Sequence, residues 1–168
     1  MNTADRMDEL GDGADSCELQ LRQYGRRAEF DGPIRTLRCY EDIGLLRELL
    51  AQPGAGAVLV VDGRSSLRCA ILGDRLAGSA VRNGWSGLVI AGAVRDTRAL
   101  ADIDLGIKAL GSNPRRGTAD GTGEIDVPVT FGGTTFVPEQ HVWCDVDGVV
   151  VTRPRSFVPT RRRGTQTP

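Results

Sequence analysis

Residues 71–96, ILGDRLAGSAVRNGWSGLVIAGAVRD, decide the fold that we expect for this chain. The first half predicts a helix from Gly73 to Asn83, because its apolar residues fall on one narrow face and an Asn-Gly pair ends it. The second half contains a continuous apolar run from Gly87 to Ala91, which is typical of a buried strand. A helix of about 11 residues covers about 16 Å, and a strand of about five residues covers roughly the same distance in return. The chain should therefore come back to the edge of the sheet that it left.

Three polar side chains fall at that edge. Asp74 stands at the start of the helix, and Arg95 and Asp96 follow the strand. Crossovers of this type are regular in hand and length, and open α/β sheets bind ligands at this edge. The free N–H groups at the start of the helix suit a carboxylate. On spacing alone, the same residues also fit an N-cap aspartate beside a surface ion pair.

The residue types fit a small anionic substrate. Arg95 can hold a carboxylate or a 2-oxo oxygen and stabilise negative charge that develops there. Asp96 is a hard oxygen ligand for a divalent cation, Mg²⁺ or Mn²⁺. Asp74 is a candidate to orient a water on the metal or to assist proton transfer. The candidate catalytic residues are therefore Arg95 and Asp74, and the candidate metal ligand is Asp96.

The rest of the chain predicts one α/β domain. We expect the following elements around the central stretch: a helix over 41–52, strands over 57–61 and 67–70, a helix over 97–104 and a strand over 107–110. Four further strands are expected over 127–131, 134–137, 141–145 and 149–152. Because α/β units occupy the middle and only strands follow, the pattern favours a layered β/β/α domain over a doubly wound sheet. We place the domain at 17–152, between a flexible N-terminal segment, 1–16, and a polar, disordered tail, 153–168.

The bulk composition limits the partners and the compartment. A length of 168 residues suits one domain, and a net charge of −1 argues against direct binding to nucleic acid or to a membrane surface. The four cysteines form no CxxC pair, so we expect buried free thiols. No signal peptide or membrane-length apolar run occurs in the sequence, which predicts a cytoplasmic protein.

Several other residues suggest chemistry at first sight. Lys108 is the only lysine among 21 basic residues, and it falls in a predicted strand away from the candidate site. His141 is the only histidine, and no nearby carboxylate in the sequence predicts a catalytic role for it. Trp85 is expected to anchor packing between helix and strand. No G-x-G-x-x-G follows Asp62-Gly63, which disfavours a methyltransferase.

Several motifs together carry a family resemblance: Ile71–Ala77, Asn83–Ile90, Gly92–Asp96, Asp102–Gly111, Asn113–Arg116, Val127–Gly133 and Asp145–Val150. Through them the sequence resembles the family of the regulator of ribonuclease E activity A and its pyruvate-releasing aldolase relatives. The resemblance spans about Cys17 to Val151. It implies a swivelling-domain-like fold and assembly as homotrimers or dimers of trimers.

The resemblance also implies site roles. Aldolase-competent members carry an Asp, twenty intervening residues and then Arg-Asp, a pattern that Asp74, Arg95 and Asp96 match. By this resemblance, substrate binds to Arg95 and to the loop residues Gly73, Asp74, Arg75 and Leu76, and Asp96 binds the metal.

Three functions follow as hypotheses. The first is a metal-dependent lyase that cleaves 4-hydroxy-4-methyl-2-oxoglutarate or 4-carboxy-4-hydroxy-2-oxoadipate to pyruvate and also decarboxylates oxaloacetate. The second is a non-catalytic regulator that binds and inhibits ribonuclease E. The third, a methyltransferase, is the weakest. The presence of Asp96 favours the first, because a docking surface has no use for a metal ligand.

Overall fold

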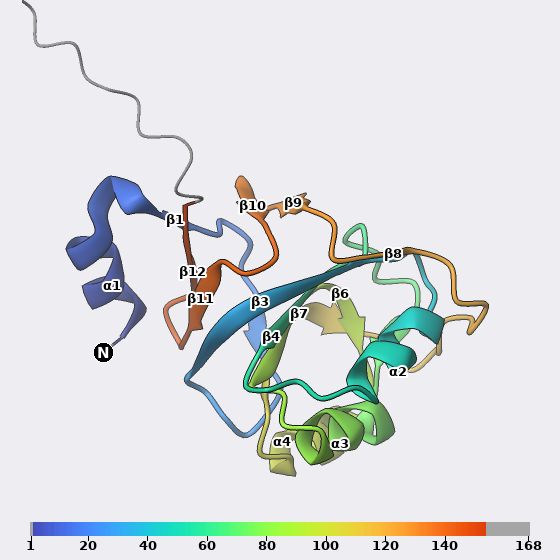
Figure 1. Ribbon diagram of the computed structural model, residues 1–168. Coiled ribbons are helices and arrows are strands. Elements are labelled where there is room, and N and C mark those ends of the chain that lie inside the picture. The colour runs from blue at the N-terminus through green and yellow to red at the C-terminus, as the bar shows by residue number, and fades with distance from the viewer. Residues whose placement is uncertain (1, 154–168) are drawn as a thin grey trace, which may run out of the picture.

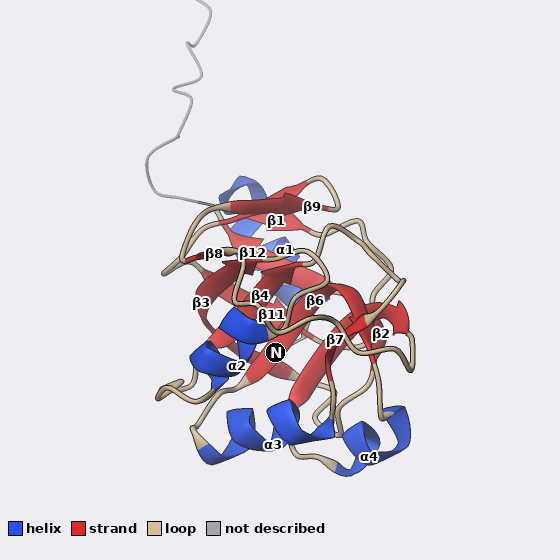
Figure 2. Ribbon diagram, turned by 90° about the vertical axis from the view of Figure 1, so that its right-hand side faces the viewer, coloured by secondary structure: helices blue, strands red, loops and turns tan. Residues whose placement is uncertain are grey.

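The computed structural model describes residues 2–153, in which helices cover one side of a mixed sheet and an antiparallel layer covers the other (Figures 1 and 2). The helices are α1 (Thr3–Leu10), the 3₁₀ turn η1 (Gly11–Gly13), α2 (Gly44–Leu50), α3 (Asp74–Arg82) and α4 (Thr97–Asp102). Helices α2, α3 and α4 lie together against the parallel strands, and α1 lies at the opposite side (Figure 1). No helix in the described part of the chain is long and apolar enough to cross a membrane.

The centre of the sheet is parallel. Strands β3 (Phe30–Arg38), β4 (Val58–Asp62), β6 (Gly87–Val94) and β7 (Gly106–Ser112) are neighbours in that order. Short β5 (Ala70–Leu72) pairs in parallel with the end of β6. Antiparallel β2 (Arg22–Gln23) and β8 (Glu124–Ile125) pair with β7 and β3. All eight residues of β6 are buried, as expected of a strand covered on both faces.

Strand β3 connects the two β layers. Its first half pairs antiparallel with β11 (His141–Cys144), and its second half pairs in parallel with β4. Beyond β11 the sheet continues through β12 (Val149–Thr152) to β1 (Ala14–Ser16). The hairpin of β9 (Val129–Phe131) and β10 (Thr134–Phe136) completes this layer. Figure 1 shows β3 as the long strand between the two parts.

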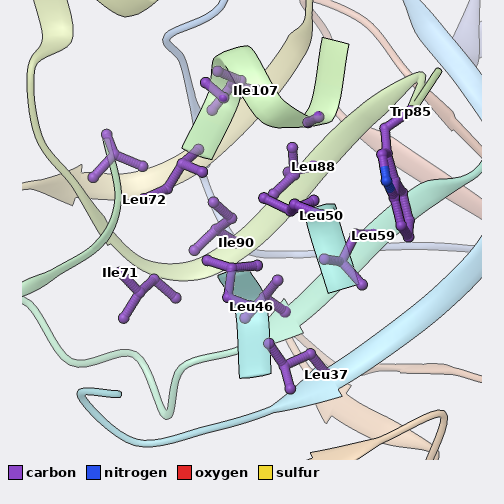
Figure 3. Close-up of a cluster of buried hydrophobic side chains, with 14 of the residues drawn as sticks. Leu37, Leu46, Leu50, Leu59, Ile71, Leu72, Trp85, Leu88, Ile90 and Ile107 are labelled. Atoms are coloured by element: carbon purple, nitrogen blue, oxygen red, sulfur yellow. The ribbon is translucent and has the colours of Figure 1, made fainter. Parts of the chain in front are cut away.

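Two hydrophobic cores lie on opposite faces of the parallel strands. On the helix side, Leu46 and Leu50 of α2 pack against Leu59, Leu88 and Ile90 of the sheet (Figure 3). On the other side, alternate residues of the same strands pack against the antiparallel layer; this core includes Ile34, Val58, Val60, Val89, Phe131, Phe136 and Val142. Two cores with one shared sheet confirm the layered α/β fold expected from the sequence.

For residues 1–16 the acidic, Gly-rich sequence predicts either a loose segment or a short helical start, and the structure has a short helix. Helix α1 and strand β1 form there, and β1 pairs with β12. The Thr3 N–H and hydroxyl donate to the buried carboxylate of Asp145, at 2.6 and 2.7 Å. These contacts span 142 residues in sequence, so no local pattern predicts them. Of the tail expected over 153–168, only Arg153 lies within the described residues.

Strand β3 was not predicted, and the bounds of some elements differ. Helix α2 begins at Gly44 instead of Glu41, because Glu41 has a φ of 53° and cannot continue a right-handed helix. The strand expected over 67–70 is β5, which begins three residues later and ends two residues later. The two cores of the protein nevertheless use the apolar runs on which the prediction was based.

Single residues of the core follow their expected roles. All four cysteines are free and buried. Burial raises the pKa of the Cys39 thiol to about 12, so this thiol stays protonated near neutral pH. Trp85 is buried, and its indole N–H donates to the carbonyl oxygen of Gln52 at 3.1 Å, which ties the end of α2 to the start of β6.

Candidate functional site

The crossover from β5 through α3 to β6 brings the candidate residues to one edge of the sheet. The N–H of Arg95 donates to the carbonyl oxygen of Leu72 at 2.9 Å, so the ends of β5 and β6 are joined. The N–H of Asn113 donates in turn to Val94 at 3.0 Å, which adds the end of β7. Helix α3 starts directly after β5, and α4 starts directly after Asp96.

Asp74, Arg95 and Asp96 lie within one small cluster. The Asp96 Oδ2 atom lies 3.4 Å from the Asp74 backbone nitrogen and 3.5 Å from Arg95 Nε. Asp96 has a φ of 56°, a left-handed conformation that is uncommon outside glycine, and it directs the chain into α4. The Arg95 and Asp96 side chains are 35% and 39% exposed, so both groups remain accessible to a ligand.

Gly73 provides the space for this cluster. A Cβ atom at position 73 would lie 2.6 Å from Asp96 Oδ2 and 3.3 Å from Arg95 Nε. Gly73 has an extended backbone, with φ −138° and ψ −175°, that any residue can adopt. Lack of room beside Asp96, and not backbone conformation, therefore accounts for glycine here.

A cavity of about 250 Å³ opens at this edge. Its lining comes from separate parts of the chain: Ile43, Arg47, Ala70–Leu72, Gly73–Leu76, Arg95 and Arg116. All the proposed substrate-binding residues therefore line one cavity. Asp96 does not line it; this residue lies at the edge, against Gly73 and Arg95.

The start of helix α3 is partly occupied by its own side chain. Asp74 Oδ1 accepts a hydrogen bond from the Arg75 N–H at 2.7 Å, which leaves the second carboxylate oxygen of Asp74 for other partners. The first N–H groups of a helix have no partner within the helix. A carboxylate bound here would therefore have to displace the Asp74 side chain from Arg75 or use the next N–H, that of Leu76.

Asp96 fits a metal that keeps most of its water. The described residues contain no group of three or more His, Cys, Asp or Glu side chains that could enclose a metal ion. Mg²⁺ is commonly held by one or two carboxylates together with substrate oxygens and waters, so it does not need such an enclosure. The half-exposed Asp96 carboxylate beside an open cavity fits that mode of binding.

Two arginines of the cavity were not assigned by sequence reasoning. Arg47 lies on α2, and Arg116 lies in the loop after β7. Arg116 belongs to a motif of the family resemblance, but its position beside Ala70 depends on a long-range backbone contact. Arg47 resembles any exposed helix residue in sequence, so no signal could have identified it.

A buried carboxylate, Asp42, holds these two parts of the wall together. Asp42 is 1% exposed and accepts hydrogen bonds from five groups of the chain. The donors are the N–H groups of Gly44, Asp120 and Gly121 and the hydroxyls of Thr118 and Thr122. Burial alone would raise the pKa of Asp42, but these hydrogen bonds outweigh burial and lower it below the ordinary value. Asp42 therefore stays ionised and fixes the loop after Arg116 against α2.

Lys108 and His141 lie outside the cavity. Lys108 is on β7 and is 2% exposed; burial lowers its pKa, and Cys144 and Asp145 of the antiparallel layer partly offset this effect. His141 Nε2 lies 2.7 Å from Asp31 Oδ2, a carboxylate that is not near this histidine in the sequence. Asp31 is 110 residues away in sequence and reaches His141 only because β3 pairs with β11.

Fold and cavity together define a class: layered α/β proteins with a ligand-sized cavity at the carboxyl ends of parallel strands. The family described as RraA-like, Aldolase/RraA, matches residues 2–151. The chain therefore belongs to the RraA-like family, which includes both aldolases and ribonuclease E inhibitors.

Solved structures agree with this family. The RNA-processing inhibitor RraA from Thermus thermophilis is 40% identical, with a TM-score of 0.88 over 95% of this chain and 97% of that one. A Geobacillus kaustophilus protein described as S-adenosylmethionine:2-dimethylmenaquinone methyltransferase is 42% identical, with a TM-score of 0.89 over 90% and 94%. Streptomyces coelicolor RraAS2, described as an unusual member of the RNase ES inhibitor RraA family, is 29% identical, with a TM-score of 0.75 over 93% and 81%.

Proposed function

We propose that this protein is a divalent-metal-dependent lyase that releases pyruvate from 2-oxo acids, by retro-aldol cleavage and by decarboxylation of oxaloacetate. The observation that carries the proposal is the cluster of Asp74, Arg95 and Asp96 at the mouth of a cavity lined by Gly73–Leu76. 4-Hydroxy-4-methyl-2-oxoglutarate and 4-carboxy-4-hydroxy-2-oxoadipate are the proposed aldol substrates. The active form proposed is a homotrimer or a dimer of trimers.

The proposed roles follow from the contacts. The N–H groups at the start of α3 bind the carboxylate of the pyruvyl unit, and Arg95 contacts its 2-oxo oxygen. Asp96 holds a divalent cation, Mg²⁺ or Mn²⁺, which when bound acts as a Lewis acid on substrate oxygens. Asp74 offers its free carboxylate oxygen as a proton acceptor.

The chemistry requires stabilisation of a pyruvate enolate. In the retro-aldol reaction, the 4-hydroxyl proton passes to a base, the C3–C4 bond breaks, and its electron pair moves into the enolate of pyruvate. The guanidinium of Arg95 stabilises the negative charge on the enolate oxygen. Protonation of C3 then gives pyruvate. In oxaloacetate the C4 carboxylate is already ionised, so no base is needed: the C3–C4 bond breaks, carbon dioxide leaves, and the electron pair of that bond forms the same enolate.

Removal of the cation tests the metal requirement. We expect the protein to release pyruvate from oxaloacetate in the presence of Mg²⁺ or Mn²⁺. This pyruvate release should stop when a chelator is present in excess over the cation. Pyruvate is measured by coupling to lactate dehydrogenase, with the spontaneous, metal-catalysed decarboxylation subtracted. Activity should return on adding back the cation. Turnover no faster than the protein-free reaction, with metal present, would falsify the proposal.

Gly73→Ala tests the close packing beside Asp96. The added Cβ would lie 2.6 Å from Asp96 Oδ2, so the carboxylate has to move. We expect pyruvate release to fall by about tenfold or more, since displacements of about 1 Å can cost 10²-fold. Gly78→Ala is the matched control, because glycine 78 lies on the same helix, where the nearest atom to a new Cβ is the flexible end of Arg82 at 3.3 Å. Equal activity of both variants would contradict a role for this packing.

A second candidate function is regulation of ribonuclease E. It is favoured by the 40% identity to the RNA-processing inhibitor from Thermus thermophilis. This function requires a binding surface and neither Arg95 nor a metal. Capture of ribonuclease E by the purified protein would support this regulatory function if the Asp96→Ala variant captures it equally well. Such binding is compatible with lyase activity in the same protein.

A further inference from the structure

The cavity holds more positive charge than a pyruvyl unit needs. Four arginines line it, Arg47, Arg75, Arg95 and Arg116, against one aspartate, Asp74. Arg95 lies 3.5 Å from Asp96. Among residues 2–153, no carboxylate oxygen lies within 4.0 Å of a guanidinium nitrogen of the other three. Unpaired guanidinium groups around one small cavity favour a ligand with more than one negative charge.

Two of these arginines come from segments other than the loop and strand end assigned to the pyruvyl unit. Arg116 lies beside Ala70, because Ala70 donates to Arg115 at 2.6 Å and accepts from Gly117 at 3.0 Å. Ala70 precedes Gly73 by three residues of extended chain, or about 10 Å at ~3.3 Å per residue. Arg47 enters from α2, one turn after Ile43, which also lines the cavity.

These two positions are fixed by the fold. The buried Asp42 carboxylate binds both the start of α2, through Gly44, and the loop after Arg116, through Thr118 and Gly121. The chain segments that carry Arg47 and Arg116 are thereby held on the same side of the cavity. A carboxylate between them would meet two cationic side chains whose backbone positions are already fixed, so less of the chain has to be ordered on binding.

We infer that Arg47 and Arg116 form a subsite for a second carboxylate at the far end of the substrate. The inference rests on the proposed function, since the first carboxylate is taken to bind at Gly73–Leu76. It assigns two residues to the second carboxylate that each of the substrates proposed above carries. The two arginines act on specificity and affinity and not on the bond that breaks. The volume, about 250 Å³, is below the ~300–1,000 Å³ of pockets for drug-sized ligands and suits such a small acid.

Binding of two stable probes tests the subsite. Pyruvate carries only the first carboxylate, and 2-oxoglutarate carries both but has no 4-hydroxyl and cannot be cleaved. In titration calorimetry of the full chain with Mg²⁺, we expect 2-oxoglutarate to bind at least about tenfold more tightly than pyruvate. Arg47→Gln and Arg116→Gln should each weaken 2-oxoglutarate about tenfold, the loss expected for one charge-assisted hydrogen bond, and leave pyruvate unchanged.

Arg82→Gln is the matched control, because Arg82 is an exposed arginine at the far end of α3 that does not line the cavity. It should alter neither affinity, and equal melting temperatures should show that all variants are folded. Equal affinity of the wild-type protein for both probes overturns the subsite and leaves the pyruvyl site standing. So does a loss of pyruvate binding that matches the loss of 2-oxoglutarate binding in the variants. If neither pyruvate nor 2-oxoglutarate binds, the proposed function is overturned and the subsite with it.

Discussion

Arg95→Ala is expected to lower pyruvate release from oxaloacetate by about 100-fold or more, with the fold intact. Removing one donor that stabilises a developing oxyanion typically costs 10²- to 10³-fold in rate. The side chain is 35% exposed and packs at the edge of the sheet, outside both cores, so its loss should not unfold the protein. The measurement is the lactate dehydrogenase-coupled assay at saturating Mg²⁺.

Three further variants make this result specific. Asp96→Ala should abolish activity and also remove the response to added Mg²⁺, because the proposed ligand is gone. Arg95→Lys keeps the charge but loses the forked guanidinium, and we expect it to recover only part of the rate. Arg98→Ala, an exposed arginine on the neighbouring helix α4, should behave as wild type. Activity that survives both Arg95→Ala and Asp96→Ala would leave the ribonuclease regulator as the better hypothesis.

Asp42→Ala is expected to lower the free energy of unfolding by about 3 kcal/mol or more. The substitution removes the acceptor of the buried Gly44 N–H and of the part-buried hydrogen bonds from the N–H groups of Asp120 and Gly121. Hydrogen bonds to a charged group contribute about 1.5–3 kcal/mol each. For a domain of this size, about 3 kcal/mol corresponds to a fall in melting temperature of roughly 6–12 °C. Urea unfolding at equal protein concentration gives the free energy directly. Asp8→Ala, an exposed position on α1, is the control and should change it by less than about 0.5 kcal/mol.

The contribution of Asp42 to the free energy of unfolding should also depend on pH, and it should decrease in acid. The hydrogen bonds lower the pKa of Asp42 in the folded protein below 3.8, the ordinary value that we take for the unfolded chain. A carboxyl group with a lowered folded pKa stabilises the protein above its unfolded pKa, and this stabilisation is lost as the pH falls through the folded value. The difference in stability between wild type and Asp42→Ala should therefore be constant near neutral pH and shrink below about pH 4. A difference that grows on acidification would contradict this assignment.

The antiparallel and N-terminal parts show where local patterns fail. Strand β3 has nine residues and connects both layers. It was not predicted because Gly32 and Pro33, which are uncommon in strands, interrupt its alternating pattern. Helix α1 has only Thr3 buried, so its own residues carry no core-facing stripe. Its attachment depends on Asp145, at the other end of the chain. Contacts of this kind are set by tertiary pairing, which overrides local propensity.

The candidate site divides in the same way. The sequence by itself determined the parallel centre, because continuous apolar runs such as 87–91 are typical of strands covered on both faces. It also determined that Asp74 and Arg95-Asp96 share one edge, because helix and strand lengths match. Only the tertiary structure decided that Gly73 must be small, that Asp42 pins a distant loop, and that Arg47 and Arg116 join the cavity. The physical reason is separation along the sequence. The periodicity and length of helices and strands predict contacts within one crossover. A cavity wall is made by segments that are distant in sequence and meet only after the whole sheet has formed.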